Sequence, residues 1–216
     1  MMDNERIAAY LRSLKQTEDP FLAKLRKEAL ETGVPILRTD TEALLSFFTE
    51  LVKPSEILEL GTAIGYSGTV MLRHGNARLT TVENYEPRIE RAKRTFEEAG
   101  LSERVTLIPE DAGEVLKRLS GPYDLIFLDA AKAQYVTWLP EILRLMKPGS
   151  VLIADNVFQD GNVLESRFAV RKRDRTVHER MRAFLEAVER NPDLESAVLN
   201  VGDGVSVSVL KGAMRS

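Results

Sequence analysis

The chain has 216 residues, of which 44% are hydrophobic and 29% charged, and its formal net charge at pH 7 is -3. These values are typical of one globular domain, and the charge gives no global argument for binding nucleic acid. The absence of cysteine excludes disulfides, thiolate nucleophiles and cysteine-ligated metal centres. The first ten residues, MMDNERIAAY, are too polar for a signal peptide, and no apolar run reaches the roughly 20 residues that span a bilayer. We therefore expect a cytoplasmic protein with no membrane association.

The N-terminal part of the chain has a helical pattern. Apolar side chains recur at helical spacing at Leu11, Leu14, Phe21, Leu22, Leu25 and Leu30. The letters TDTE before ALLSFFTELV form a capping box, with Thr39 as the expected N-cap and Glu42 bonding back to its amide. Between these helices, GVPIL at 33–37 is expected to be extended, because the residue before a proline avoids the α region. We assign residues 1–53 to an N-terminal helical cap and residues 54–216 to the core of the same domain.

After residue 53, strand-like and helical patterns alternate. Five apolar runs are expected to form strands: Glu56–Leu60, Leu79–Glu83, Val105–Pro109, Leu125–Asp129 and Val151–Asp155. Helical patterns lie between them, including Glu86–Ala99 and Lys132–Met146. Five β–α units in succession predict an α/β fold, in which helices cover both faces of a parallel sheet. Near the end, residues 196–201 and the run VSVSVL alternate around Gly-Asp-Gly, which predicts an antiparallel hairpin that closes the sheet.

A glycine-rich turn, ILELGTAIGYSG at 57–68, follows the first expected strand. It lacks the second glycine of a dinucleotide fingerprint and the Gly-Lys-Ser/Thr of a P-loop. Alone it could be a turn that only connects a strand to a helix. However, Glu83 ends the second strand, where an acid can bond ribose hydroxyls, and Asp111 follows the third, where it could reach an adenine edge. Each acid alone could be a solvated strand end or a helix cap, but the three features together predict a site for an adenosine-containing cofactor.

Several ordered motifs carry a resemblance to a known family. They are LELGTAIGYS, VE at 82–83, EDA at 110–112, LDAAK at 128–132, ADNV at 154–157 and the terminal VGDGVSVSV. Over nearly its whole length the chain resembles S-adenosylmethionine (SAM)-dependent O-methyltransferases of the catechol/caffeoyl-CoA type. The resemblance implies a Rossmann-like fold with a seven-stranded, mostly parallel sheet, an antiparallel last strand and extra N-terminal helices. It also implies a homodimer, in which the N-terminal helices help to cover the site, and a cofactor held by Leu37, Glu59, Gly61, Gly65, Ser67, Glu83, Asp111, Ala112 and Asp129.

A second group of polar residues ends the fourth and fifth strands. Asp129 lies at the end of one, and Asp155 and Asn156 at the end of the other. Two carboxylates and an amide oxygen are ligands suited to Mg²⁺, Mn²⁺ or Ca²⁺ and poor for zinc, and the resemblance assigns a divalent metal to these three residues. The alternative is that the acids cap the next helix or bind water.

Lys132, three residues after Asp129, is the candidate general base. Methyl transfer to oxygen needs a deprotonated hydroxyl, and a metal that orients the hydroxyl also lowers its pKa. The same dication would lower the Lys132 pKa by favouring the neutral amine. The alternative is a solvated lysine in the first turn of a helix, although that turn disfavours a cation.

The acceptor is less clearly indicated. The run RFAVRKRDRTVHERMR at 167–182 holds seven Lys/Arg residues and two acids. It is either a solvated basic helix face or a phosphate-contacting patch for a polyanion, formed by Arg167, Arg171, Lys172, Arg173 and Arg175. Two polyanions fit, namely tRNA and an acyl-CoA ester. Four aromatic residues could stack on either acceptor, although the last two also fit a core stripe: Tyr66, Phe158, Tyr135 and Trp138.

In VPIL, GTAIGYS, DAAKAQY, DNV and VGDG, the chain resembles the bacterial branch that methylates 5-hydroxyuridine at the tRNA wobble position. The first hypothesis is therefore a tRNA methyltransferase that forms 5-methoxyuridine. The second is a small-molecule catechol or caffeoyl-CoA O-methyltransferase, because a catechol offers the same site two adjacent hydroxyls. A third, a binding protein that has lost catalysis, is disfavoured by the intact set Asp129, Lys132, Asp155 and Asn156.

Overall fold

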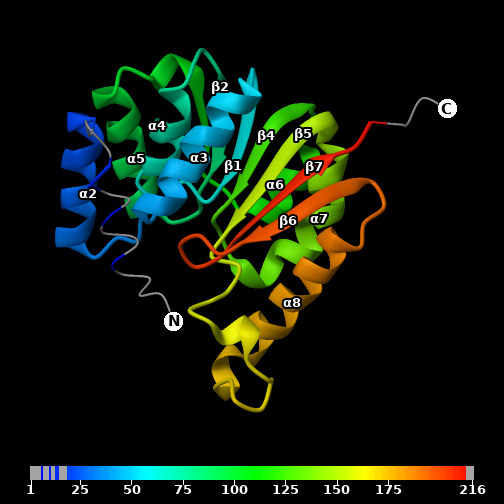
Figure 1. Ribbon diagram of the computed structural model, residues 1–216. Helices are drawn as coiled ribbons and strands as arrows, with labels where there is room; N and C mark the ends of the chain where they lie inside the picture. The colour runs from blue at the N-terminus through cyan, green and yellow to red at the C-terminus, as the bar shows by residue number, and fades with distance from the viewer. Residues whose placement is uncertain (1–5, 7–9, 11–12, 15–18, 213–216) are drawn as a thin grey trace.

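A seven-stranded sheet runs through the centre of the structure in the order β3-β2-β1-β4-β5-β7-β6 (Figure 1). The computed structural model describes residues 6, 10, 13–14 and 19–212. β7 is antiparallel to β5 and β6, whereas the other neighbouring strands pair in parallel, as the resemblance implied. The strands are β1 (Glu56–Leu60), β2 (Arg78–Val82), β3 (Val105–Ile108), β4 (Tyr123–Leu128), β5 (Met146–Asp155), β6 (Leu194–Leu199) and β7 (Val205–Leu210).

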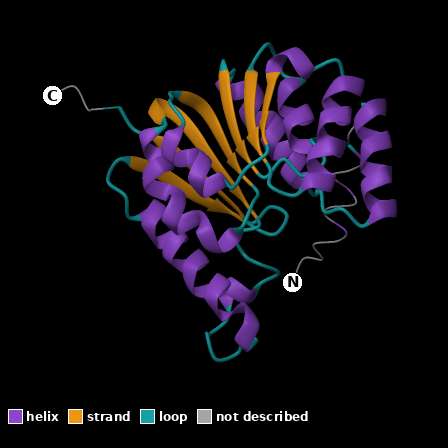
Figure 2. Cartoon of the chain, turned by 180° about the vertical axis from the view of Figure 1, so that it is seen from behind, coloured by secondary structure: helices purple, strands orange, loops and turns teal. Residues whose placement is uncertain are grey.

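Helices cover both faces of this sheet (Figure 2). On one face lie α2 (Pro20–Thr32), α3 (Thr39–Val52), α4 (Tyr66–Leu72) and α5 (Glu86–Glu98), which share a core with Ile57 and Phe127. On the other lie α6 (Ala112–Arg118), α7 (Tyr135–Arg144) and α8 (Arg175–Glu189), which share a core with Leu58 and Ile126. Short 3-10 turns are η1 (Ser102–Arg104), η2 (Lys132–Gln134), η3 (Asn162–Leu164) and η4 (Lys172–Asp174). Because successive strand residues are buried on opposite faces, the strands read as continuous apolar runs.

The order in which the chain adds strands to the sheet reverses at β1, which pairs with both β2 and β4. The chain moves outward from β1 to β3 and then crosses back to β4. In open α/β sheets such a reversal leaves a crevice at the carboxyl ends of the strands, where ligands bind. This topology positions the loops after β1, β2, β4 and β5 around one site.

Most element types agree with the sequence patterns, and the differences lie at the boundaries. β1 has the expected limits, but β5 begins at Met146, a residue expected to end a helix, and η2 and α7 replace a single helix from Lys132. The capping box is wrong: Arg38 is the N-cap of α3 without a side-chain cap, and Glu42 bonds to Arg26 and Tyr66. Of the expected N-terminal stripe, Leu11 lies outside the described residues. In the part of the chain that is described, no helix has the length and apolar character needed to cross a membrane.

Candidate active site

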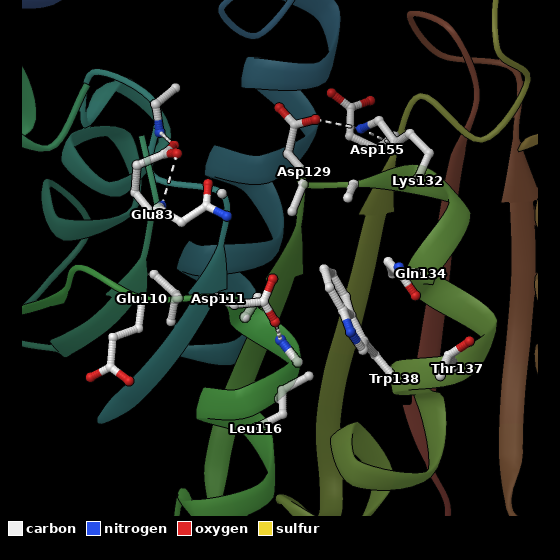
Figure 3. A pocket seen from close by; sticks show the side chains of 18 of the residues that line it. Glu83, Glu110, Asp111, Leu116, Asp129, Lys132, Gln134, Thr137, Trp138 and Asp155 are labelled. Atoms are coloured by element: carbon white, nitrogen blue, oxygen red, sulfur yellow. Dashed lines mark hydrogen bonds and ion pairs between the residues drawn. The ribbon is translucent and has the colours of Figure 1, made fainter. Parts of the chain in front are cut away.

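A cavity of about 1080 Å³ lies at the carboxyl ends of the parallel strands. The loops after β1, β2 and β4 contribute Gly61, Glu83 and Asp129 to its walls, and the last residue of β5, Asp155, lines it as well. Figure 3 shows the acidic side chains and Trp138 arranged around this space. The segment 33–38, between α2 and α3, adds Pro35, Ile36 and Arg38, which sequence reasoning did not select. The cavity is therefore built from both the core and the helical cap.

The glycine turn brings the backbone close to this cavity. Gly61 has a φ of 103°, and a Cβ there would lie 2.2 Å from the backbone oxygen of Asp129. Only glycine allows this approach of β1 to β4. Glu83 fixes the rest of the turn, because its carboxylate accepts hydrogen bonds from the amides of Ala63 at 3.0 Å and Tyr85 at 3.1 Å. Gly61 and Glu83 thus line the cavity together, as their strand-end positions predicted.

Glu59 lies behind the turn instead of in the cavity wall. Its side chain is fully buried and accepts hydrogen bonds from the hydroxyls of Ser67 and, at 2.6 Å, Thr81. Burial raises the pKa of Glu59 to about 7, although these two hydrogen bonds oppose the shift. Of the predicted cofactor residues, four are absent from the residues that line the cavity: Leu37, Glu59, Gly65 and Ser67. Their direct contact with a cofactor stays a prediction.

Asp111 and Trp138 also line the cavity. Asp111 is the N-cap of α6 and accepts a hydrogen bond from the amide of Gly113 at 2.9 Å, so it has both the capping role and a place in the cavity. Ala112 lies beside it. Trp138, from α7, approaches Gly113 so closely that a Cβ on that glycine would lie 3.0 Å from its indole nitrogen. A carboxylate beside an indole suits a flat base that carries hydrogen-bond donors.

Burial leaves Tyr135 and Tyr66 no exposed face for the stacking role considered from sequence, whereas Phe158 is half-buried and its stacking stays a prediction. Tyr135 is fully buried, and Tyr66 is buried with its hydroxyl bonded to Glu42 at 2.8 Å. Phe158 packs against Gly204, where a Cβ would lie 2.5 Å from the ring. Trp138, whose helical stripe favoured a core role, is buried and lines the cavity as well. A stripe residue in the first turn of a helix can do both, and its position shortly after the strand that ends at Leu128 was the available signal.

The ammonium of Lys132 is surrounded by oxygens from the predicted metal ligands, namely the side chains of Asp129 and Asn156 and the backbone of Asp155. Its Nζ lies 2.5 Å from Asp129 Oδ1, 3.1 Å from Asn156 Oδ1 and 3.2 Å from the backbone oxygen of Asp155. Burial, followed by the charge of Asp129, raises the pKa of Asp155 to about 6. Convergent oxygens with excess negative charge fit a hard divalent cation. Among the described residues no group of three or more His, Cys, Asp or Glu could hold a metal, so the amide and backbone oxygens would have to complete the set.

Lys132 is charged in this environment. Burial alone would lower its pKa, but the nearby Tyr135 hydroxyl and Asp129 carboxylate outweigh burial and raise the pKa well above its usual value. The lowering expected from sequence required a bound dication, and it stays a prediction. Figure 3 shows the Lys132 side chain reaching from η2 toward Asp129 and Asp155.

The predicted basic patch lies beyond the carboxyl end of β5, where residues 156–175 project away from the sheet (Figure 1). Arg171 and Arg173 line a second cavity of about 470 Å³. Arg167 pairs with Glu179, and Arg175 donates to the backbone oxygen of Val170 at 3.2 Å, so their charges are partly engaged within the chain. Lys172 lies in η4 and is exposed. Between these cations, the side chain of Phe168 is 85% exposed, a feature that sequence reasoning missed.

Comparisons with known proteins agree with this geometry. The family model described as O-methyltransferase matches residues 12–211. The catechol O-methyltransferase of Niastella koreensis is 35% identical over 170 residues, covering 74% of this chain and 76% of that protein. The O-methyltransferase from Bacillus cereus, solved with SAH, has a TM-score of 0.84 at 25% identity, covering 95% of this chain and 97% of that one. TomG from Streptomyces achromogenes, solved with SAM, has a TM-score of 0.84 at 27% identity, covering 98% and 100%.

Proposed function

We propose a reaction and an acceptor from one premise: the chain belongs to the O-methyltransferase family and is a SAM-dependent enzyme. The proposed reaction is metal-dependent transfer of the SAM methyl group to a hydroxyl oxygen. The observation that carries it is a group of three oxygens around the Lys132 ammonium beside the cavity: the Asp129 carboxylate, the Asn156 amide oxygen and the backbone oxygen of Asp155. The Asp155 residue lines the same cavity. The proposed metal is Mg²⁺, with Mn²⁺ or Ca²⁺ as alternatives, since all three prefer oxygen ligands.

The residues then have distinct roles. Asp129, Asp155 and Asn156 would hold the metal ion. Asp129 also lies next to the glycine turn, where the cofactor would bind. A bound dication would lower the pKa of an acceptor hydroxyl and favour the neutral amine of Lys132. Lys132 would accept the hydroxyl proton at Nζ while the oxygen attacks the methyl carbon. The methyl–sulfur bond breaks, and S-adenosylhomocysteine is released.

The proposed acceptor is 5-hydroxyuridine at the tRNA wobble position, which becomes 5-methoxyuridine. Support comes from the basic segment after β5, where two arginines line a second cavity and Phe168 offers an exposed ring for stacking on a base. Action on tRNA is consistent with the cytoplasmic location that we propose. The second candidate is a catechol or a caffeoyl-CoA-type phenol, and the name of the Niastella koreensis relative favours it.

The acceptor is tested by offering both substrates to one preparation with labelled SAM. Undermodified tRNA is expected to be labelled at 5-hydroxyuridine, identified by nucleoside mass spectrometry. Arg171→Gln with Arg173→Gln should weaken tRNA binding and its salt dependence while catechol turnover, if any, stays unchanged. Arg190→Gln, which removes a similarly exposed arginine at the other end of α8, is the control. Labelling of catechol alone would replace the tRNA proposal with the second candidate.

A homodimer is also proposed. On α3, the side chains of Phe47 and Leu51 are 61% and 65% exposed and lie one turn apart on the same helix face. An exposed apolar face of this kind favours association. Light scattering should give twice the chain mass, and Phe47→Glu with Leu51→Glu should halve it. A monomeric unmodified protein would contradict this proposal.

A further inference from the structure

Arg26 of α2 joins the helical cap to the cofactor cavity. Its guanidinium donates to the backbone oxygen of Leu37 at 3.0 Å and to the Tyr66 hydroxyl at 2.7 Å, and it forms an ion pair with Glu42. The same group lies over the Tyr66 ring, 5.0 Å from its centroid. We propose that Arg26 is a positioning residue, which holds the segment 33–38 against the cavity and thereby sets the affinity for SAM.

The contacts of Arg26 reach four parts of the chain. They connect α2 with the segment 33–38, with the first turn of α3 through Glu42, and with α4 through Tyr66. The segment 33–38 needs such an anchor because it belongs to no helix or strand up to Leu37. Its cavity-lining residues Ile36 and Arg38 directly flank Leu37. Fixing the Leu37 carbonyl therefore fixes both neighbours.

The cluster formed by Arg26, Glu42 and Tyr66 is shielded from water, so its polar groups depend on one another for hydrogen bonds. The side chains of Arg26 and Glu42 are 19% and 12% exposed, and Tyr66 is 2% exposed. Burial and the Glu42 carboxylate raise the pKa of Tyr66, so its hydroxyl stays protonated and donates to Glu42 at 2.8 Å. A planar guanidinium can meet these partners at once, whereas the single nitrogen of lysine cannot. Arg26→Lys thus keeps the charge beside Glu42 and loses the simultaneous contact with Leu37.

A second arginine pair provides a matched control. Arg91 of α5 binds Glu28 of α2 through two hydrogen bonds, at 2.5 and 2.6 Å, and its side chain is 14% exposed. This pair also fastens α2 to the core, but neither residue lines the cavity or contacts the segment 33–38. Arg91→Gln should therefore loosen α2 without releasing the segment.

The test measures binding of S-adenosylhomocysteine by calorimetry, and it depends on neither the proposed metal nor the proposed acceptor. Arg26→Lys is expected to raise Kd about tenfold or more, because the segment is no longer preorganised. Arg91→Gln should leave Kd within about twofold, even if it lowers the Tm as much as Arg26→Lys does. With a working acceptor assay, kcat at saturating SAM should stay within about twofold for Arg26→Lys. Equal changes in Kd for the two variants, or an unchanged Kd for Arg26→Lys, would overturn the proposal.

A second variant and a second readout cover the case in which Arg26→Lys folds poorly. Glu42→Gln keeps the shape of the cluster but removes the charge that holds the guanidinium, and it should raise Kd about two- to fivefold. Release of the segment should also speed tryptic cleavage after Arg38 in both variants, and S-adenosylhomocysteine should suppress it. Cleavage at the unmodified rate in a folded variant would show that Arg26 does not hold the segment.

Discussion

Lys132 places a single positive charge among oxygens from Asp129, Asp155 and Asn156. An ammonium can satisfy such a set in the absence of another cation, but it has three donors and one charge, whereas a divalent ion supplies two charges to the same oxygens. Under the proposed function, metal and ammonium therefore compete for one position. Lys132 would therefore neutralise these oxygens in the metal-free protein and act as the general base when the metal is bound.

Lys132→Met is expected to change both properties. Turnover should fall about 10²- to 10⁴-fold, the range for loss of a general base. At the same time Mg²⁺ should raise the Tm of the variant more than that of the unmodified protein, because the oxygens have lost their internal cation. Thermal unfolding with and without Mg²⁺ measures this difference. Lys93→Met is the control, because it removes an exposed lysine that pairs with an acid three residues away, Glu90. The same rise in Tm with Mg²⁺ in both variants and the unmodified protein would contradict the competition.

Asp155→Ala separates chemistry from cofactor binding. The carboxylate belongs to the proposed metal set, while Glu83 and Asp111, which line the same cavity, belong to the predicted cofactor site. We expect methyl transfer to fall more than about 100-fold and S-adenosylhomocysteine affinity to change little. Asp124→Ala, at the opposite end of β4, should affect stability alone. Full activity of Asp155→Ala in a chelating buffer would refute the metal assignment.

Residues at strand ends could be selected from sequence because parallel strands end at the same edge of a sheet. Gly61, Glu83 and Asp111 were selected in this way, and the structure places all three on one cavity. The contacts of Arg26 could not be predicted, since they join residues 11, 16 and 40 positions apart and leave no local pattern. The charge state of Lys132 could not be predicted either, because it depends on the balance between burial and the nearby Tyr135 and Asp129.

At the scale of elements, β1 and β4 are set close together by one glycine. Gly61→Ala must displace the backbone of Asp129, because the new Cβ would lie 2.2 Å from its oxygen. Gly149→Ala carries a similar positive φ of 88° but meets no atom within 4 Å. We expect both variants to lose about 1–2 kcal/mol from backbone strain, and Gly61→Ala to lose at least about 2 kcal/mol more and its SAM binding.

Urea unfolding of the two glycine variants measures this difference directly. If they proved equally stable, the backbones that follow β1 and β4 could move apart enough to accept a methyl group.

Element boundaries show the same dependence on tertiary contacts. The sequence predicted the limits of β1 but misplaced the start of β5 and the cap of α3, where Glu42 bonds with Arg26 and Tyr66 in place of the helix terminus.

At the scale of the whole molecule, one buried acid links stability to pH. Glu59 has no exposed surface, and burial, aided by the charges of Asp129 and Glu83, holds its pKa at about 7 against an ordinary value of 4.5. Between these values the folded protein keeps a proton that the unfolded chain has lost. Protonation therefore favours the folded state, and stability falls as pH rises through this window. Below about pH 4.5 both states are protonated, and above about pH 7 the full cost of the buried charge is present.

Glu59→Gln isolates this effect because its side chain does not titrate, while other acids such as Asp155 titrate alike in both proteins. Relative to the variant, the free energy of unfolding of the unmodified protein should fall by about 3 kcal/mol between about pH 4.5 and 8, at about 1.4 kcal/mol per pKa unit. Urea unfolding at about pH 4.5, 6 and 8 measures the difference. The lost hydrogen bonds to Ser67 or Thr81 add an offset that is the same at each pH. A difference that does not vary with pH would mean that Glu59 ionises in the folded protein as readily as in the unfolded chain.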